Sequence, residues 1–270
     1  MAAELRGDIM FEKSSREFSL GDAEARAFSS AIAPHIVAVL PPGGDVGTGT
    51  LVCWKSIGLV LTANHNLDGT KPSEVRFCFY PGGSLGDGPM TPQVHGDLYR
   101  GILTPADDVM FADKANDILA IRLNLEDLPG AAKFYQIDPR VPTINHGATI
   151  TLAGYACDNS FPLPQNSRAV GITVQSGRFD TTLNSRRDLS SQYRAADHFL
   201  LPYSRVEEGI RPYGISGAGA WANAGCPSEV WAACPLLVGV QTCWFPKAKV
   251  LQIVRLEPIL TLLERTVSPP

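Results

Sequence analysis

A histidine, an aspartate and a serine occur in that order along the chain, and each stands where it could take part in catalysis. His65 follows the apolar run 58–63, Asp117 opens the apolar run 118–121, and Ser216 lies among small residues. A serine hydroxyl attacks a carbonyl carbon when an imidazole takes its proton and a carboxylate orients that imidazole. Together the three residues predict acyl-transfer chemistry, although Asp117 alone also fits an ordinary residue at the start of a strand.

The segment around Ser216 also predicts a site that stabilises an oxyanion. In the sequence Gly214-Ile215-Ser216, the backbone N–H groups of Gly214 and Ser216 could face one point. Glycine at position 214 permits a backbone orientation that a side chain would obstruct. Taken alone, the same segment also fits a glycine-rich hairpin turn.

The order of the histidines limits the hydrolase architectures that fit. All five histidines precede Ser216, whereas the α/β-hydrolases place the base after the serine. His65 is the candidate base because it stands where a strand passes into a loop, a common place for active-site residues. The other four are interpreted as surface or hydrogen-bonded residues: His35 on the first strand, His95 in a loop, His146 in a turn, and His198 in a surface pair with Asp197.

Asp117 has rivals for the role of the orienting acid in Asp107, Asp108 and Asp113. Only Asp117 leads directly into an apolar strand, which would anchor and partly bury its carboxylate. No two histidines have the spacing of a metal site, so neither a metal ion nor a cofactor is expected.

Short apolar runs, punctuated by glycine and proline, predict the elements that must position these residues. The expected strands cover 36–40, 47–53, 58–62, 75–80, 101–104 and 117–123 in the first half, and 149–155, 171–175, 198–201, 219–221 and 236–241 in the second. Residues 124–148 are predicted to connect the halves, and the apolar spacing over 253–265 predicts a helix. The pattern indicates an all-β fold of two packed barrels after an N-terminal leader over residues 1–31.

Composition narrows the classes of function further. The chain has 270 residues, of which 44% are hydrophobic and 19% charged, and its net charge is −4. Such a chain can bury a sizeable core, and it offers no basic surface for nucleic acid. No run reaches the length of a membrane span, and the N-terminus lacks the apolar stretch of a secretion signal. We therefore expect a cytoplasmic protein that contacts neither nucleic acid nor a membrane.

The six cysteines include no C-x-x-C pair, which argues against a structural zinc site. Cys226 and Cys234 are the best candidates for a disulfide bridge. For a cytoplasmic chain, however, all six are expected to be reduced.

The motifs around the three candidate residues resemble those of the chymotrypsin/trypsin-like serine peptidases. Residues 61–65 resemble the histidine motif of that family, 117–121 the aspartate motif and 214–219 the serine motif. The resemblance covers residues 32–265. It implies two packed six-stranded antiparallel β-barrels, over about 32–125 and 148–250, and a C-terminal helix over about 253–265.

The resemblance also implies roles for individual residues. His65 would be the general base, Asp117 would orient it, and Ser216 would be the nucleophile. The N–H groups of Gly214 and Ser216 would form the oxyanion hole.

The resemblance further implies where a substrate would bind. The floor of the specificity pocket falls on Ile210, which predicts an apolar pocket. Trp244 stands where the family usually has glycine, so it is expected to narrow or close the cleft. The remaining residues expected to line the binding site are Arg211, Tyr213, Gln241 and Thr242.

Two departures from the family pattern bear on regulation. Asn66 replaces the cysteine that usually follows the histidine, and Ile215 replaces the aspartate that pairs with a newly formed N-terminus in secreted members. Activation by that pairing is therefore not expected. Control by a partner protein, another domain or a conformational switch is expected instead, with residues 1–30 and the loop 81–92 as candidate elements.

The leading hypothesis is therefore a serine endopeptidase that acts on protein or peptide substrates and is controlled by a regulatory partner or a conformational switch. The main alternative is a protease-like module whose closed cleft only binds a peptide or a partner. A third hypothesis is an esterase, since it would use the same acyl chemistry.

Overall fold

Strands dominate the part of the chain that the computed structural model describes, which comprises residues 22–42, 46–71, 74–79, 110–123, 133–162, 168–185, 189, 193–224 and 232–267. The α-helices within it are α2 (Asp22–Ile32) and α3 (Leu256–Val267). Short 3₁₀ helices are η2 (Ala33–His35), η3 (Asn64–Leu67), η8 (Thr181–Ser185) and η9 (Arg205–Glu208). The predicted all-β class is confirmed.

The first half of the chain forms one sheet with the strand order β4-β1-β2-β3-β6-β5, in which all neighbours are antiparallel. Its strands are β1 (Ile36–Leu40), β2 (Gly47–Trp54), β3 (Ile57–Ala63), β4 (Arg76–Phe79), β5 (Met110–Asp113) and β6 (Ile118–Arg122). Lys55 and Ser56, both with positive φ, form the tight turn between β2 and β3. The short strand β7 (Tyr135–Gln136) adds to this sheet by pairing in parallel with β2.

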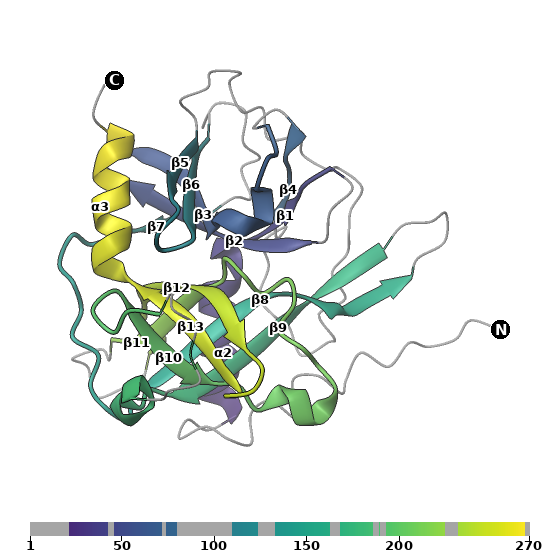
Figure 1. Ribbon diagram of the computed structural model, residues 1–270, viewed down its shortest axis with the longest axis vertical. Coiled ribbons are helices and arrows are strands. Elements are labelled where there is room, and N and C mark those ends of the chain that lie inside the picture. Colours follow the sequence, from purple (N-terminus) through teal and green to yellow (C-terminus); the bar gives the residue numbers. More distant parts are fainter. Residues whose placement is uncertain are drawn as a thin grey trace.

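The second half forms a six-stranded antiparallel sheet with the order β10-β13-β12-β11-β8-β9. Its strands are β8 (Thr149–Pro162), β9 (Arg168–Arg178), β10 (His198–Pro202), β11 (Gly219–Asn223), β12 (Pro235–Phe245) and β13 (Val250–Arg255). Figure 1 shows the first sheet above the second, with α3 standing beside them. The predicted double-barrel fold with six antiparallel strands in each half is confirmed, and β7 adds a parallel strand to the first half.

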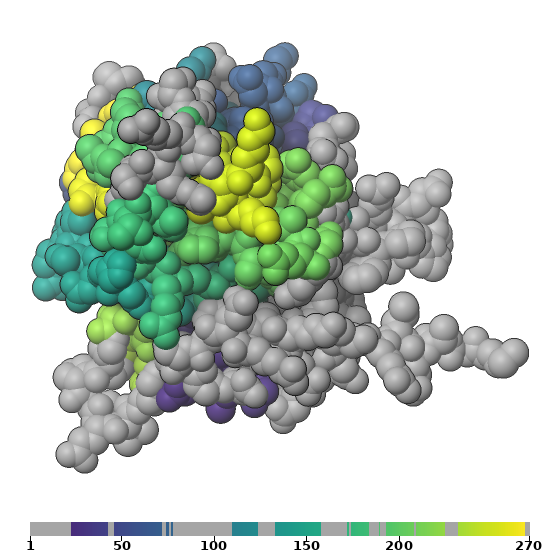
Figure 2. All heavy atoms as spheres, turned by 60° about the horizontal axis from the view of Figure 1, so that its bottom comes forward, coloured from purple at the N-terminus to yellow at the C-terminus, as the bar shows by residue number. Residues whose placement is uncertain are grey.

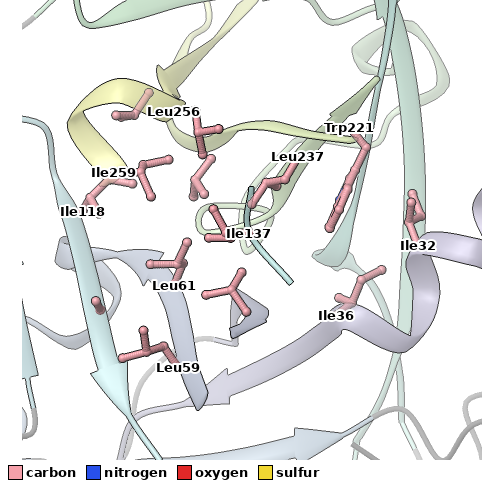
Figure 3. Packing of buried hydrophobic residues seen from close by; sticks show 14 of the residues in the cluster. Ile32, Ile36, Leu59, Leu61, Ile118, Ile137, Trp221, Leu237, Leu256 and Ile259 are labelled. Atoms are coloured by element: carbon pink, nitrogen blue, oxygen red, sulfur yellow. The ribbon is translucent and has the colours of Figure 1, made fainter. Parts of the chain in front are cut away.

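One hydrophobic cluster joins the two sheets and both helices (Figure 3). The first sheet contributes Leu61 and Ile118, and the second contributes Trp221, all of them at most 1% exposed. Ile32 from α2 and Ile259 from α3 complete the contact at 0% exposure. Burying side chains of this size contributes about 1.5–3 kcal/mol each. The cluster therefore fixes the two sheets relative to each other.

Part of the predicted N-terminal leader belongs to the folded body. Phe28 and Ile32 of α2 are 3% and 0% exposed, and they belong to the same hydrophobic cluster as both sheets. Atoms of α2 also reach the surface, as the purple spheres at the lower edge of Figure 2 show. Residues 1–21 of the predicted leader lie outside the described residues.

The predicted C-terminal helix begins later than expected. Residues 253–255 belong to β13, which pairs with β10 on one side and β12 on the other, and α3 begins at Leu256. Ile253 and Val254 are both 0% exposed. A strand buried on both faces has a continuous apolar run, which periodicity does not distinguish from a buried helix.

The remaining strand predictions differ at several points. Strands β5 and β7 were not predicted, and β8, β9 and β12 are longer than expected. The predicted strand over residues 101–104 lies outside the described residues.

The expectation that all cysteines are reduced is wrong for Cys234, which is disulfide-bonded. Cys53, Cys157 and Cys243 are not disulfide-bonded. Cys226 and the side chain of Cys78 lie outside the described residues. Within the described part of the chain, no helix is long and apolar enough to cross a membrane.

Candidate active site

The pairing of β3 with β6 brings His65 and Asp117 to the same end of the first sheet. Ala63, the last residue of β3, lies opposite Ile118, the first residue of β6. His65 follows β3 in η3, and Asp117 immediately precedes β6. The backbone N–H of Asn64 donates to the carbonyl of Asp117 at 2.9 Å, which ties the two segments together beyond the sheet.

His65 contacts both oxygens of the Asp117 carboxylate. Its ring Nδ1 lies 2.6 Å from Oδ2, and its backbone N–H donates to Oδ1 at 2.9 Å. With Nδ1–H directed to a carboxylate, the neutral ring leaves Nε2 free to accept a proton. The side chains of His65 and Asp117 are 51% and 31% exposed, so the ring remains open to a ligand.

Asp117 is held in a left-handed backbone conformation with a φ of 56°. Such a conformation costs about 1–3 kcal/mol and persists only where its surroundings enforce it. Asn116, the preceding residue, is 7% exposed and donates its side-chain amide to Asp113 at 2.6 Å. Arg194 Nη2 then donates to Asn116 Oδ1 at 2.7 Å. Asp113, the rival acid, therefore supports the turn that presents Asp117.

Ser216 lies in a turn between two glycines with left-handed backbone angles. The φ values are 89° at Gly214 and 97° at Gly217. A β-carbon at Gly217 would overlap the carbonyl oxygen of Thr48, so glycine is required there for two reasons. Between the glycines, Ile215 is 1% exposed and packs into the core of the second sheet.

Strand β2 of the first sheet holds the carbonyl groups of this turn. Thr48 donates from its hydroxyl to the Gly214 carbonyl at 2.6 Å and from its backbone N–H to the Ser216 carbonyl at 3.1 Å. Thr50 donates from its hydroxyl to the Gly217 carbonyl at 3.1 Å. The N–H groups of Gly214 and Ser216 donate to no atom of the described residues.

Ser216, the candidate nucleophile, lies beside Asn66, the residue that follows His65. Asn66 donates its side-chain amide to the Ser216 carbonyl at 2.7 Å, across the boundary between the two sheets. The Ser216 hydroxyl makes no hydrogen bond within the described residues. Catalytic hydrogen bonds commonly form only when a substrate is bound, so this geometry remains compatible with proton transfer to His65.

Two of the residues expected around the specificity pocket, Ile210 and Trp244, both contact Tyr203. Trp244 contacts the ring of Tyr203 edge-on, with the ring centroids 5.3 Å apart. The Tyr203 hydroxyl donates to the carbonyl of Ile210 at 3.1 Å, and both Ile210 and Trp244 join the core cluster of the second sheet. The indole of Trp244 is thus packed into the apolar region that the sequence assigns to the pocket.

The other four residues expected to bind substrate fall into two groups. Arg211 and Tyr213 are exposed, and the guanidinium of Arg211 lies 5.1 Å from the centre of the Tyr213 ring. Gln241 and Thr242 are 0% and 1% exposed. Their side chains are not available to a substrate in this structure. The carbonyl of Gln241 instead accepts a hydrogen bond from the Gly217 N–H at 2.7 Å.

His198 is not in a surface pair, contrary to the sequence-based interpretation. It is 0% exposed, because β10 is buried between the rest of the second sheet and the segment around Tyr193. Its Nδ1 accepts the backbone N–H of Arg194 at 3.0 Å, and Asp197 pairs with Arg194. Burial, reinforced by the positive charge of Arg194, lowers the pKa of His198 below its usual value of 6.5.

Two of the remaining histidines contact residues outside the candidate triad. His35 ends η2 just before the first strand and stacks on Trp221 with the ring centroids 5.7 Å apart. His146 lies in a turn, as predicted, and is exposed. His95, together with Asp107 and Asp108, lies outside the described residues. Within the described part of the chain, no group of three or more acidic, cysteine or histidine side chains could hold a metal ion.

Sequence reasoning missed the residues that support the candidate triad. Asn66, Thr48, Asn116 and Arg194 act through contacts with segments between 78 and 166 positions away in the chain. For Asn66 alone there was a signal, because it stands where the resembled family has cysteine. For the others no local pattern indicates the role.

Comparisons with known proteins identify the fold of the chain but do not assign it to a family. No protein-family model and no curated protein sequence matches the chain. Among solved structures, the active form of the Rv3671c protease from M. tuberculosis is 15% identical, with a TM-score of 0.51 over 92% of this chain and 87% of that one. A serine endoprotease from Yersinia pestis is 14% identical, with a TM-score of 0.51 over 92% of this chain and 68% of that one.

A third similar structure is an inactivated protease paralogue of the scabies mite, S-I1. It is 16% identical, with a TM-score of 0.55 over 88% of this chain and 96% of that one. The protein therefore has the fold of the chymotrypsin-like serine proteases, as the sequence predicted. Since this fold occurs in both active and inactivated proteins, the activity must be argued from the site.

Proposed function

We propose that the protein is a serine endopeptidase with the triad Ser216, His65 and Asp117. The observation that carries the proposal is the double hydrogen bond between His65 and the Asp117 carboxylate beside the Ser216 turn. The paired base and acid lie next to a serine and to two backbone N–H groups that donate to no atom of the described residues. This arrangement combines the parts that acyl transfer requires.

The proposed reaction has two halves. The Ser216 hydroxyl attacks the carbonyl carbon of the scissile bond while its proton passes to His65 Nε2, and the N–H groups of Gly214 and Ser216 stabilise the oxyanion. His65 then gives the proton to the departing amine, which leaves an acyl-enzyme. Water, deprotonated by His65, releases the acyl group and restores the serine.

For specificity, we propose that the protein accepts small residues at the cleavage site. Tyr203 contacts both Trp244 and Ile210, and these two pack against the core of the second sheet where a bulky side chain would enter an apolar pocket. The exposed pair of Arg211 and Tyr213 is proposed to line the approach to Ser216.

A protease-like binding module is the second candidate function. The same packing of Trp244 favours it, because a filled pocket could hold a peptide only on the outer surface. An inactivated protease paralogue also stands among the similar structures. This candidate predicts that Ser216 is unreactive.

Labelling with a fluorophosphonate probe tests the endopeptidase proposal. We expect the full chain to be labelled, and Ser216→Ala and His65→Ala to remain unlabelled although both fold like the wild type. Cleavage of an unstructured protein then distinguishes a peptidase from an esterase, which would hydrolyse only activated esters. A folded wild type that is not labelled, with or without added cell extract, would favour the binding module.

Two further proposals concern the regulation of the protein and its cellular compartment. A partner protein, supplied by the extract in the same assay, is proposed to raise the labelling rate of the isolated chain. The disulfide bond at Cys234 favours an oxidising compartment over the predicted cytoplasmic one. The oxidation state of Cys234 in protein isolated under alkylating conditions decides between the two compartments.

A further inference from the structure

Asn66 directly follows the candidate base and uses its side-chain amide in two hydrogen bonds. Its Nδ2 donates to the Ser216 carbonyl at 2.7 Å and to the Thr62 hydroxyl at 3.0 Å. An amide nitrogen has two hydrogens, so both donors of Asn66 are engaged. One of the bonds stays within the first sheet, and the other crosses to the turn that carries Ser216.

These bonds are part of a closed ring. Thr62 donates from its hydroxyl to the Thr48 carbonyl at 2.6 Å, and the Thr48 backbone N–H donates to the Ser216 carbonyl at 3.1 Å. The Ser216 carbonyl therefore accepts two hydrogen bonds, one from backbone and one from Asn66. A ring in which every donor and acceptor is paired resists displacement of any one member.

The surroundings of Asn66 are shaped to hold this amide. A β-carbon at Gly47 would lie 2.7 Å from Asn66 Nδ2, so only glycine at position 47 leaves room for it. On the other side, Leu67 is 4% exposed and anchors η3 in the core of the first sheet. The space left by Gly47 thus holds the Asn66 amide, which lies against the Ser216 carbonyl.

We propose that Asn66 is a positioning residue that sets the separation between His65 and Ser216. The inference rests on the proposed function, because it concerns the same base and nucleophile. Asn66 is covalently joined to His65 and hydrogen-bonded to Ser216, so it links the two across the two sheets. A displacement of about 1 Å between reacting groups can lower a rate roughly 100-fold.

The rate of fluorophosphonate labelling at saturating probe tests this role. Asn66→Leu keeps the size of the side chain and removes both donors, and Asn66→Asp replaces the amide with a carboxylate that repels the Ser216 carbonyl. We expect both variants to lower the maximal labelling rate by roughly 10- to 100-fold. The probe concentration at half-saturation should stay unchanged, because the variants alter the attack and not the binding of the probe.

Asn64 provides a matched control on the other side of His65. Its side chain makes no hydrogen bond within the described residues, so Asn64→Leu and Asn64→Asp should stay within twofold of the wild-type rate. Asn64→Asp also reproduces the added negative charge next to His65. Asn66→Gln, which keeps an amide donor, should recover part of the rate lost in Asn66→Leu.

Gly47→Ala tests the same contact without changing Asn66. The added methyl group would displace the amide from Ser216, so a slower maximal rate is expected here too. Rates are expressed per folded molecule, which separates positioning from a loss of stability.

If the wild type is labelled and Asn66→Leu and Asn66→Asp match its maximal rate, the positioning role is wrong while the proposed function stands. If the wild type itself is not labelled, the proposed function fails and the role of Asn66 fails with it.

Discussion

The carboxylate of Asp117 accepts two hydrogen bonds from one residue, His65, through the ring at 2.6 Å and through the backbone N–H at 2.9 Å. The first bond selects the tautomer of the imidazole, and the second fixes where the carboxylate stands. Together they explain how an acid that is 31% exposed and held in a left-handed conformation can orient the ring. An exposed ion pair without the second bond would have little geometric effect.

Replacing Asp117 by asparagine should abolish most of the activity and leave the fold intact. The amide keeps the size of the carboxylate but favours the tautomer of His65 whose Nε2 cannot accept a proton. We expect the labelling rate at pH 7 to fall on the order of 10³- to 10⁴-fold. Asp68→Asn, which removes the same charge three positions after His65, is the control and should change the rate by less than threefold. Equal losses in the two variants would mean that charge alone matters.

Gly217→Ala should unfold or strongly destabilise the protein. Its φ of 97° disfavours any side chain, and the new β-carbon would overlap the Thr48 carbonyl. We expect a loss of more than about 3 kcal/mol in the free energy of unfolding, measured by urea denaturation. Gly69→Ala isolates the backbone contribution, because Gly69 has a φ of 74° and nothing within 4 Å of the added carbon. That variant should lose only about 1–2 kcal/mol.

The candidate triad could be predicted from the sequence because each member lies next to a local pattern. His65 and Asp117 adjoin apolar strands, and Ser216 lies among glycines, so their settings follow from short segments. Their order along the chain then removed the α/β-hydrolases without any knowledge of contacts.

The supports of the triad could not be predicted, because they depend on contacts between distant segments. The replacement of cysteine by Asn66 marks that position but not its partner, and no pattern marks Thr48, because both bond to carbonyls around Ser216 that are 150 and more residues away. Contacts between distant segments also decide β13, whose last residues, 253–255, were assigned to the C-terminal helix. They also explain His198, whose burial is due to the neighbouring strands of the second sheet.

Trp244→Ala should broaden the specificity of the protein. Removing the indole leaves a space beside the Tyr203 ring that could accept a bulky apolar side chain. We expect the labelling rate by a peptide phosphonate with a phenylalanine side chain to rise at least tenfold relative to one with an alanine side chain. Creating the cavity should also cost about 3–5 kcal/mol of stability.

Phe245→Ala controls for the loss of stability alone. Phe245 is the next residue in the chain, is 8% exposed, and packs in a different hydrophobic cluster. The ratio of its labelling rates with the phenylalanine and alanine probes should match the ratio measured for the wild type. If Trp244→Ala also left the ratio unchanged, the indole would not limit access to the pocket.

The burial of His198 predicts that the protein loses stability as the pH falls below about 6.5. Its pKa is lowered in the folded state, first by burial and then by the positive charge of Arg194, with Arg255 acting in the same direction and Asp197 against it. Below pH 6.5 the unfolded chain binds a proton at this position and the folded protein does not, so acid favours unfolding. The free energy of unfolding should fall by up to about 1.4 kcal/mol per pH unit for this group until the folded-state pKa is reached.

Urea denaturation between pH 7.5 and pH 5 measures the effect of His198. His198→Asn keeps an acceptor for the backbone N–H of Arg194 and cannot be protonated, so its stability should depend less steeply on pH. Some dependence should remain, because burial also lowers the pKa of His35. A slope unchanged in His198→Asn would show that the neutral form of this histidine does not limit stability in acid.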